Sequence, residues 1–369
     1  MKALLVAGEA SGDLYGGELI SALRRRLPSL EVASMGGDQM ALAGADLLYH
    51  YRDVAVVGVF EVFRKLVHLK RAYSRIRRWI FDNKPDFAVL IDFPDFNFRL
   101  VRYLRRQRIK TFYFISPQVW AWRKHRIHFL RDHIDLMICI LPFESDLYTN
   151  AGVPVTYVGH PLVEFVREEV DQQPSFPRGS KPLVGLMPGS REIEVRRHLP
   201  ILLDTIRLIR QTMDIDVVVI WPPWLTLTGN LSSAGCRVEQ THRYAAMKAC
   251  DLLLVASGTS TLEAAILGVP LFIVYRVGPI SWQLGKILVR VPYYGLVNWI
   301  AQDKRIPEYI QEAMNPKRLS VDAVKLLRDE RLKLQMKEEL GRIISKLGPP
   351  GAMERVADTI INRINEAQR

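Results

Sequence analysis

Short apolar runs recur along the chain and alternate with longer segments in which apolar residues return every three or four positions. A short run is typical of a strand buried on both faces of a parallel sheet, and the longer pattern is typical of an amphipathic helix. The runs that predict strands are residues 2–7, 31–35, 86–91, 111–115, 136–141, 155–158, 183–187, 217–221, 252–256 and 271–275. Because strands alternate with helices, the sheets should be parallel and covered by helices on both faces.

This alternation starts twice, so the sequence predicts two domains. A polar segment rich in turn-forming residues, 171–182, lies between the two halves. We expect an α/β protein with two Rossmann-like, doubly wound domains that face each other across a cleft, where the ligands of such a pair bind. The expected divisions are an N-terminal domain over 1–165, a linker over 166–182, a C-terminal domain over 183–347, and a last helix within 348–369 that can pack back on the N-terminal domain.

Loops of small residues follow three of the predicted strands. They contain Gly8 and Gly12, then Gly189-Ser190-Arg191, then Ser257-Gly258-Thr259. The first turn of a helix has unpaired N–H groups and a partial positive charge, so phosphate binds there favourably. Glu263 lies one turn into the helix after the third loop, where a carboxylate can accept hydrogen bonds from two sugar hydroxyls. An ordinary N-capped helix, with Glu263 favoured by the helix dipole, fits that stretch equally well.

Two carboxylates, Asp92 and Asp95, come directly after the strand at 86–91. Open α/β sheets bind ligands at the carboxyl ends of their strands, so either carboxylate is a candidate catalytic group. Asp92 could instead cap the strand end, and Asp95, which follows Pro94, could be a turn residue bonded to its own backbone. His160 falls near the expected hinge, where a structural and a substrate-binding role both remain open.

The segment from residue 54 to residue 81 combines bulky apolar residues with clustered positive charge. That combination is typical of a helix that lies on a membrane surface. The candidate membrane contacts are Phe60, Phe63, Leu66, Val67, Leu69, Lys65 and Arg71. The alternative is a core helix with a solvated basic face.

Composition limits the function classes. The formal net charge of +12 allows nucleic acid, a phosphorylated substrate or an anionic membrane surface as a partner. The three cysteines show no metal-binding spacing and are expected to be reduced thiols of a cytosolic protein. No stretch approaches 18 uninterrupted apolar residues, so no transmembrane helix is expected.

Seven stretches together resemble one family. They read VAGEASGD from Val6, IDFPDFN from Ile91, SPQVWAWR from Ser116, PFE from Pro142, GH from Gly159, PGSREIEV from Pro188 and ASGTSTLE from Ala256. In this order and at these separations they are similar to the lipid-A-disaccharide synthases, glycosyltransferases of the Gram-negative lipid A pathway. The resemblance covers nearly the whole chain, and residues 222–243 are its least familiar part.

The resemblance implies a GT-B fold and an inverting transfer. The donor would be UDP-2,3-diacylglucosamine, the acceptor 2,3-diacylglucosamine 1-phosphate (lipid X), and the products UDP and a β-1,6-linked disaccharide 1-phosphate. No metal or other cofactor is expected. Because both substrates carry acyl chains, we expect a cytoplasmic enzyme associated peripherally with the anionic surface of the inner membrane. A homodimer is left open.

The same resemblance suggests roles for individual residues. Asp92 would be the base that takes the proton of the acceptor hydroxyl, with Asp95 as its competitor. Glu9 would line the same cleft as base, acceptor contact or support. The expected UDP- and substrate-binding residues are Gly189, Ser190, Arg191, Ser257, Gly258, Thr259, Glu263, Asn298, Gly12 and His160.

Two rival functions follow from the same sequence. Another UDP-GlcNAc enzyme of the GT-B class, such as a 2-epimerase or a MurG-like transferase, would share the loops of the second half. A basic nucleic-acid-binding protein would need a recognisable binding motif besides bulk charge. The chain shows no such motif, so we expect no nucleic-acid partner.

Overall fold

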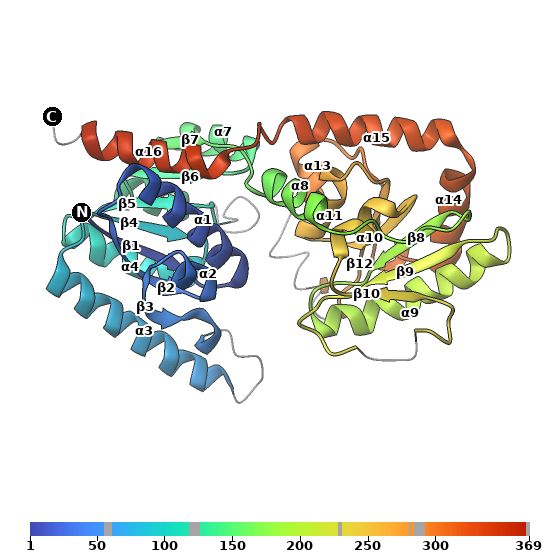
Figure 1. Cartoon of the computed structure of the whole chain (residues 1–369), viewed down its shortest axis with the longest axis horizontal. Coiled ribbons are helices and arrows are strands. Elements are labelled where there is room, and N and C mark those ends of the chain that lie inside the picture. Colours follow the sequence, from blue (N-terminus) through green and yellow to red (C-terminus); the bar gives the residue numbers. More distant parts are fainter. Residues whose placement is uncertain (55–60, 118–125, 228–230, 280–281, 284–291, 367–369) are drawn as a thin grey trace. The chain divides into compact units, whose positions relative to one another are not determined.

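The chain forms two compact units in a computed structural model, which describes the residues outside 55–60, 118–125, 228–230, 280–281, 284–291 and 367–369 (Figure 1). The first unit comprises Met1–Pro161 together with Pro349–Arg369, and the second comprises Leu162–Gly348. Each unit has its own parallel sheet with helices on both faces.

The sheet of the first unit has seven parallel strands in the order β3-β2-β1-β4-β5-β6-β7. The strands are β1 (Lys2–Ala7), β2 (Glu31–Gly36), β3 (Asp46–His50), β4 (Phe87–Ile91), β5 (Lys110–Phe114), β6 (Leu136–Cys139) and β7 (Val155–Tyr157). The order reverses between β1 and β4, which pair in register with Val6 opposite Leu90. Open α/β sheets bind their ligands at such a switch point.

Helices cover both faces of this sheet. They are α1 (Ala10–Arg26), α2 (Asp38–Leu42), α3 (Glu61–Asn83), α4 (Pro94–Arg106), α6 (Arg126–His133), α7 (Pro142–Asn150) and α16 (Ala352–Glu366), with a short 3-10 turn at Tyr51–Asp53. On one face of the sheet, alternate strand residues such as Leu4 and Val6 pack in one hydrophobic core with residues of α3, α4 and α6. The period of two along each strand therefore supplies apolar side chains to both faces.

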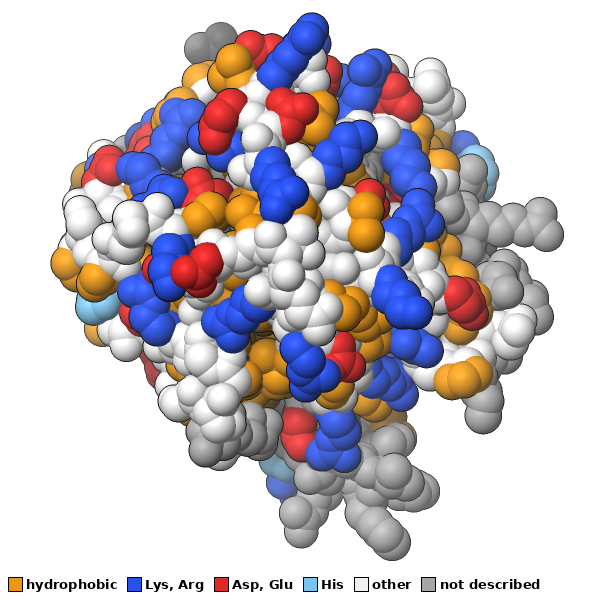
Figure 2. Space-filling model, turned by 90° about the vertical axis from the view of Figure 1, so that its right-hand side faces the viewer, with side chains coloured by type: hydrophobic (Ala, Val, Ile, Leu, Met, Phe, Trp, Pro, Cys, Tyr) orange, Lys and Arg blue, Asp and Glu red, His pale blue; other side chains and the backbone are white. Residues whose placement is uncertain are grey.

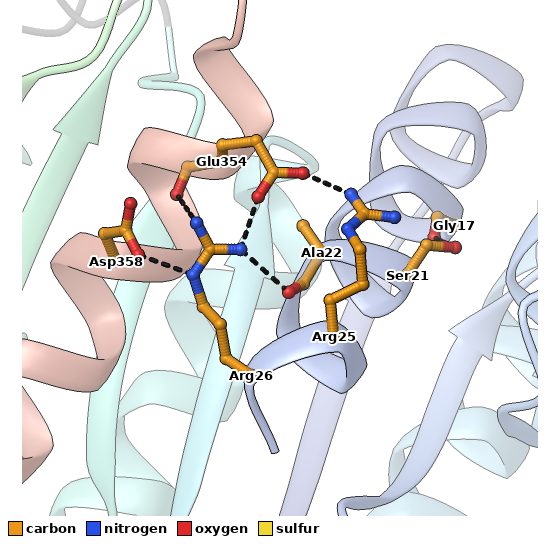
Figure 3. Close-up of polar contacts among 7 residues, drawn as sticks. All are labelled: Gly17, Ser21, Ala22, Arg25, Arg26, Glu354 and Asp358. Carbon is orange, nitrogen blue, oxygen red and sulfur yellow. Dashed lines mark hydrogen bonds and ion pairs between the residues drawn. The ribbon is translucent and has the colours of Figure 1, made fainter. Parts of the chain in front are cut away.

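The last helix belongs to the first unit, where α16 packs against α1 (Figure 1). Two arginines at the end of α1 pair with two carboxylates of α16 (Figure 3). Arg25 and Arg26 both contact Glu354, and Nε of Arg26 lies 2.5 Å from Oδ1 of Asp358. These side chains are partly exposed, so the apolar contacts beneath them, including the buried Val356 and Ile360, carry most of the attachment.

The sheet of the second unit has six strands in the order β10-β9-β8-β11-β12-β13. They are β8 (Leu183–Met187), β9 (Asp216–Ile220), β10 (Arg237–Glu239), β11 (Leu252–Ala256), β12 (Leu271–Tyr275) and β13 (Glu308–Ile310). Here the order reverses between β8 and β11. The two loops of small residues that the sequence singled out, at 189–191 and 257–259, follow these two strands and therefore meet at one switch point.

The helices of the second unit are α8 (Leu162–Gln172), α9 (Glu192–Arg210), α10 (Arg243–Ala249), α11 (Thr259–Ile266), α13 (Leu296–Ala301), α14 (Pro316–Arg328) and α15 (Glu330–Ser345), with a 3-10 turn at Gln311–Ala313. Apolar residues of α9 and α14 share a core with one face of the sheet. On the other face, α11 contacts α8, α13 and α15.

The structure differs from the sequence expectation in several elements. Three edge strands were not predicted, β3, β10 and β13, because they are short and at most partly apolar. The expected linker is helical up to Gln172, and α8 belongs to the second unit. The helix expected over 316–346 is two helices, because the side chain of Asp329 accepts hydrogen bonds from the N–H groups of Arg331 and Leu332 and so starts α15.

Positive charge is distributed over the surface of the protein. Figure 2, which views the side on which α14 lies in Figure 1, shows Lys and Arg side chains over most of that face with Asp and Glu among them. Elsewhere in the second unit, ion pairs form within single helices, such as Arg207 with Asp204 in α9 (Glu192–Arg210) and Lys333 with Glu330 in α15 (Glu330–Ser345). In the part of the chain that the structure describes, no helix is long and apolar enough to cross a bilayer.

Candidate active site

The carboxyl ends of β1 and β4 place Glu9 and Asp92 at the switch point of the first sheet. The chain turns sharply after β4, because Asp92 and Phe93 both have left-handed backbone angles, with φ of 44° and 49°. The ring of Phe93 lies against the loop after β1, where a Cβ at Gly8 would be 2.2 Å from the ring. Only glycine at position 8 allows the two loops to approach this closely.

Three hydrogen bonds hold the backbone of Asp92 in this unfavourable conformation. The carbonyl oxygen of Asp92 accepts from the Tyr113 hydroxyl at 2.6 Å and from Nδ2 of Asn97 at 2.7 Å. Its N–H donates to the carbonyl of Phe114 at 3.1 Å. Strained backbone that neighbouring groups fix in this way is common at functional sites.

The surroundings of Asp92 change its acidity. Burial, and then the negative charge of Glu9, raise the pKa of the Asp92 carboxyl to about 7, against a smaller opposite effect of the Phe93 N–H. A carboxyl with a pKa near neutrality can both accept and release a proton under physiological conditions. Asp92 is therefore equipped for general base catalysis.

Asp95, the competing carboxylate, lies in a different environment. Its side chain is 84% exposed, and Oδ1 lies 3.3 Å from a guanidinium nitrogen of Arg126. It is in the first turn of α4, where a carboxylate stabilises the helix dipole. Asp92, which is half-buried and has a raised pKa, therefore fits a general base better than the exposed Asp95 does.

The other site candidates of the first unit differ in accessibility. Glu9 is exposed, and its Oε1 accepts from the Ser11 hydroxyl at 2.6 Å. Gly12 is buried against β1, where a Cβ would be 3.0 Å from the Cβ of Ala7, so it permits close helix packing. His160 is buried, and this burial lowers its pKa to about 4, so its imidazole is neutral at pH 7.

In the second unit, the side chain of Glu194, on α9, caps the N–H groups of the loop after β8. Oε2 of Glu194 accepts from the N–H groups of Ser190 at 3.0 Å and Arg191 at 3.3 Å. The sequence reasoning expected these N–H groups to bind phosphate and did not anticipate that Glu194 would cap them. The loop also contributes a cation, because the Arg191 side chain is 75% exposed, with one guanidinium nitrogen 3.3 Å from Oε1 of the same Glu194.

The loop after β11 leaves its donors available. Within the described part of the chain, the N–H groups of Gly258, Thr259 and Ser260 have no protein acceptor. A Cβ at Gly258 would meet nothing within 4 Å, so the start of α11 is open. The hydroxyl of Ser257 donates to the carbonyl of Tyr294 at 2.6 Å and fixes the loop. The first turn of α11 therefore offers free N–H donors of the kind that bind anions.

Two further candidates of the second unit are held by neighbouring groups. Glu263 is buried, its Oε2 contacts the Arg243 guanidinium, and its Oε1 accepts from the Tyr244 hydroxyl at 3.0 Å. Asn298 is fully buried, and its amide binds the turn before β13, accepting from the N–H of Ile306 at 2.9 Å and donating to the carbonyl of the same residue at 2.8 Å. Both polar atoms of the Asn298 amide are therefore engaged with the turn before β13.

Helix α3 contains the candidate membrane contacts. Leu66 and Val67 are each 46% exposed, and Arg71 is exposed beside them. Leu69 is partly buried and packs against the core of the first unit, so less of its side chain faces outward than that of Leu66 or Val67. Phe60 lies outside the described residues, as do the side chains of Phe63 and Lys65.

Several residues that shape the site were not predicted from the sequence. They are Tyr113, Asn97, Glu194, His198 and Arg243. Only Glu194 had a local signal, because a Glu at the third position of a helix is typical of a capping box. The described residues contain no cluster of three or more His, Cys, Asp or Glu that could hold a metal ion.

Comparisons with known proteins cover nearly the whole chain. Residues 3–348 match the family described as lipid-A-disaccharide synthetase. The lipid-A-disaccharide synthase of Syntrophus aciditrophicus is 39% identical, over 99% of this chain and 98% of the relative. The enzyme of the same name from Geobacter sulfurreducens is 37% identical, over 98% of this chain and 97% of the relative.

Solved structures show the same architecture at much lower identity. The calicheamicin glycosyltransferase CalG4 has a TM-score of 0.64 at 14% identity, with 100% of this chain and 99% of that chain covered. The UDP-GlcNAc 2-epimerase of Neisseria meningitidis, solved with UDP-GlcNAc, has a TM-score of 0.64 at 12% identity and covers 98% of this chain and 100% of its own. The fold is thus GT-B, and the chain belongs to the lipid-A-disaccharide synthase family of glycosyltransferases, which form the lipid A disaccharide.

Proposed function

We propose that the protein transfers the 2,3-diacylglucosamine group of UDP-2,3-diacylglucosamine to the 6-hydroxyl of 2,3-diacylglucosamine 1-phosphate. The anomeric C–O bond to UDP breaks, the acceptor oxygen forms a β-1,6 bond from the opposite face, and UDP leaves. The observation that carries this proposal is the match to one family over residues 3–348, together with a carboxyl at the first switch point whose pKa is about 7.

The second unit would bind the donor. As the C–O bond breaks, negative charge develops on the diphosphate, and fixed N–H dipoles and a cation stabilise it without a metal ion. The first turn of α11 and the exposed guanidinium of Arg191 are suited to this role. Glu263, held by Arg243 and Tyr244, would accept hydrogen bonds from the ribose.

The first unit would bind the acceptor and remove its proton. Asp92 accepts the proton of the 6-hydroxyl as that oxygen attacks the anomeric carbon. Burial, and then the negative charge of Glu9, raise the pKa of Asp92 and so make it a stronger base than an ordinary aspartate. The hydrogen bonds from Tyr113 and Asn97 to the Asp92 carbonyl keep the carboxyl in place.

We also propose that the first unit contacts the cytoplasmic surface of the membrane that carries these acylated substrates. On α3, Leu66 and Val67 are exposed next to Arg71, Arg75 and Arg78, which are exposed as well. Apolar side chains that insert shallowly and arginines that bind anionic headgroups both favour such a surface.

The decisive experiment is a transferase assay with the full chain and both acylated substrates. Release of UDP in equal amount with a disaccharide 1-phosphate would support the proposal. UDP-GlcNAc supplied alone is the control, because its conversion to an epimer without any acceptor would point to the 2-epimerase function instead. Salt-sensitive DNA binding without UDP binding would overturn both enzymatic alternatives.

A further inference from the structure

A fully buried histidine connects two strand ends beneath the candidate donor site. His198 lies on α9, inside the core of the second unit. Its Nδ1 is 2.7 Å from the carbonyl oxygen of Pro188, which directly precedes the loop at 189–191. Its Nε2 is 2.9 Å from the backbone nitrogen and 3.1 Å from the carbonyl oxygen of Arg276, the first residue after β12.

The contacts to the Pro188 carbonyl and the Arg276 N–H fit one tautomer of the ring. A carbonyl oxygen can only accept, so Nδ1 of His198 donates a hydrogen to Pro188. The backbone N–H of Arg276 can only donate, so Nε2 accepts that hydrogen. One imidazole thus satisfies two backbone groups that would otherwise lack these partners in a buried place.

The strand order places these contacts on either side of the strand that leads into α11. In the sheet, β11 lies between β8 and β12, so His198 connects the two strands that flank it. The open first turn of α11 follows β11 between these strand ends. A shift of the β8 end relative to β12 would move the loop at 189–191, and with it Arg191, relative to the α11 N-terminus.

Other side chains also form hydrogen bonds to the loop at 189–191 and to the segment that follows β12. The indole N–H of Trp224 donates to the carbonyl of Ser190 at 3.0 Å. The amide of Gln311 pairs with both the carbonyl and the N–H of Val277, at 3.3 and 3.1 Å, in the orientation that satisfies both groups. His198 is the residue among these that joins one segment to the other.

We infer that His198 is a positioning residue for nucleotide binding: it holds the Arg191 loop at a fixed separation from the end of β12, so that Arg191 and the first turn of α11 engage one diphosphate together. This inference rests on the proposed function, because it assumes that the site binds UDP. His198 itself lies beneath the site and would not touch the nucleotide.

Three substitutions separate the two hydrogen bonds. H198N places an amide nitrogen near the position of Nδ1 and can keep the bond to Pro188, whereas H198Q can reach the Arg276 N–H with its amide oxygen. H198L is apolar, of similar size, and loses both. T205V is the matched control, because Thr205 is fully buried on the same helix and its hydroxyl donates at 2.8 Å to the Ile201 carbonyl, away from the site.

The experiment measures UDP affinity by calorimetry, thermal midpoints, and KM for each substrate with the full chain. H198L should bind UDP about 10-fold more weakly, as expected for the loss of one to two hydrogen bonds, and H198N and H198Q should fall between H198L and the parent. KM should rise for the UDP-sugar and stay unchanged for the acceptor. T205V should lower the thermal midpoint without changing UDP affinity.

The outcomes distinguish the inference from the proposed function. Parent-like UDP affinity in H198L, or an equal loss in T205V, would overturn the positioning role and leave the proposed function intact. A parent protein that binds no UDP would overturn both. If H198L does not fold, H198N and H198Q decide: weaker UDP binding in either supports the inference, and parent-like binding in both contradicts it.

Discussion

Burial, and then the negative charge of Glu9 after β1, raise the pKa of the Asp92 carboxyl, which follows β4. The two residues are 83 positions apart in the sequence and meet because β1 and β4 are neighbours in the sheet. The proposed base and the carboxylate that raises its pKa are thus brought together by the strand order rather than by a local motif.

Asp92→Asn should lower turnover by at least about 100-fold, the lower end of the range expected for the loss of a general base. UDP affinity should stay unchanged, because the proposed UDP contacts lie in the second unit. Asp95→Asn is the matched control, since it removes an exposed carboxylate paired with Arg126. A large loss of turnover in Asp95→Asn with near-normal turnover in Asp92→Asn would move the base to Asp95.

Asp92→Asn should also change how stability depends on pH. The pKa of about 7 in the folded protein lies above the usual aspartate value, so the folded state binds the proton more tightly than the unfolded state. Asp92 therefore costs stability as pH rises from about 4 to 7, and the cost is complete above that range. The variant should gain roughly 1–4 kcal/mol relative to the parent at pH 8 and little at pH 4, measured by denaturant unfolding. An equal gain at both pH values would contradict the raised pKa.

Glu9→Gln should shift the pH profile of kcat/KM. Removing the negative charge leaves burial as the main cause of the raised Asp92 pKa, so this pKa should fall but remain above its ordinary value. The deprotonated base would then persist to lower pH, and the acidic limb of the profile should move to lower pH. An unmoved limb would mean that Glu9 does not act on Asp92 in solution.

Arg191→Ala should weaken UDP binding about 10- to 100-fold, as expected for a charge-assisted contact to phosphate. Arg196→Ala is the control, because Arg196 is similarly exposed on α9, the helix that Arg191 precedes, and pairs with Glu192. Calorimetry should show a loss for the first variant only. Comparable losses in both would indicate a general effect of positive charge near α9 rather than a specific contact.

EDTA should leave transferase activity unchanged, because the proposed charge stabilisation comes from N–H groups and Arg191. The measurement compares initial rates in the full assay with and without chelator. A loss that Mg²⁺ restores would contradict the metal-free mechanism.

The sequence predicted the buried strands well, because β1, β4, β8, β11 and β12 are continuous apolar runs. It also placed Asp92 and the two loops of small residues at strand ends. It did not reveal that Glu194 occupies the N–H groups of Ser190 and Arg191, since the sequence alone does not show whether a capping glutamate or a ligand fills a helix N-terminus.

Contacts between segments that are far apart in the sequence could not be predicted, because they depend on how the strands pair in the fold. Tyr113 was an ordinary apolar strand residue in the sequence pattern, and its hydroxyl reaches Asp92 because β4 and β5 pair in register. His198 gave no signal because its partners, Pro188 and Arg276, are loop residues joined only by the fold.

Membrane binding gives the last prediction. Leu66→Ser with Val67→Ser should weaken co-sedimentation with anionic vesicles, because these exposed side chains lie beside the arginines of α3 and can insert between headgroups. UDP affinity should stay unchanged, and added salt should weaken the parent's binding, since each arginine near the surface contributes about 1 kcal/mol. Val321→Ser is the control, because Val321 is a 67% exposed residue of the second unit. Parent-like sedimentation of the double variant would show that α3 is a solvated helix.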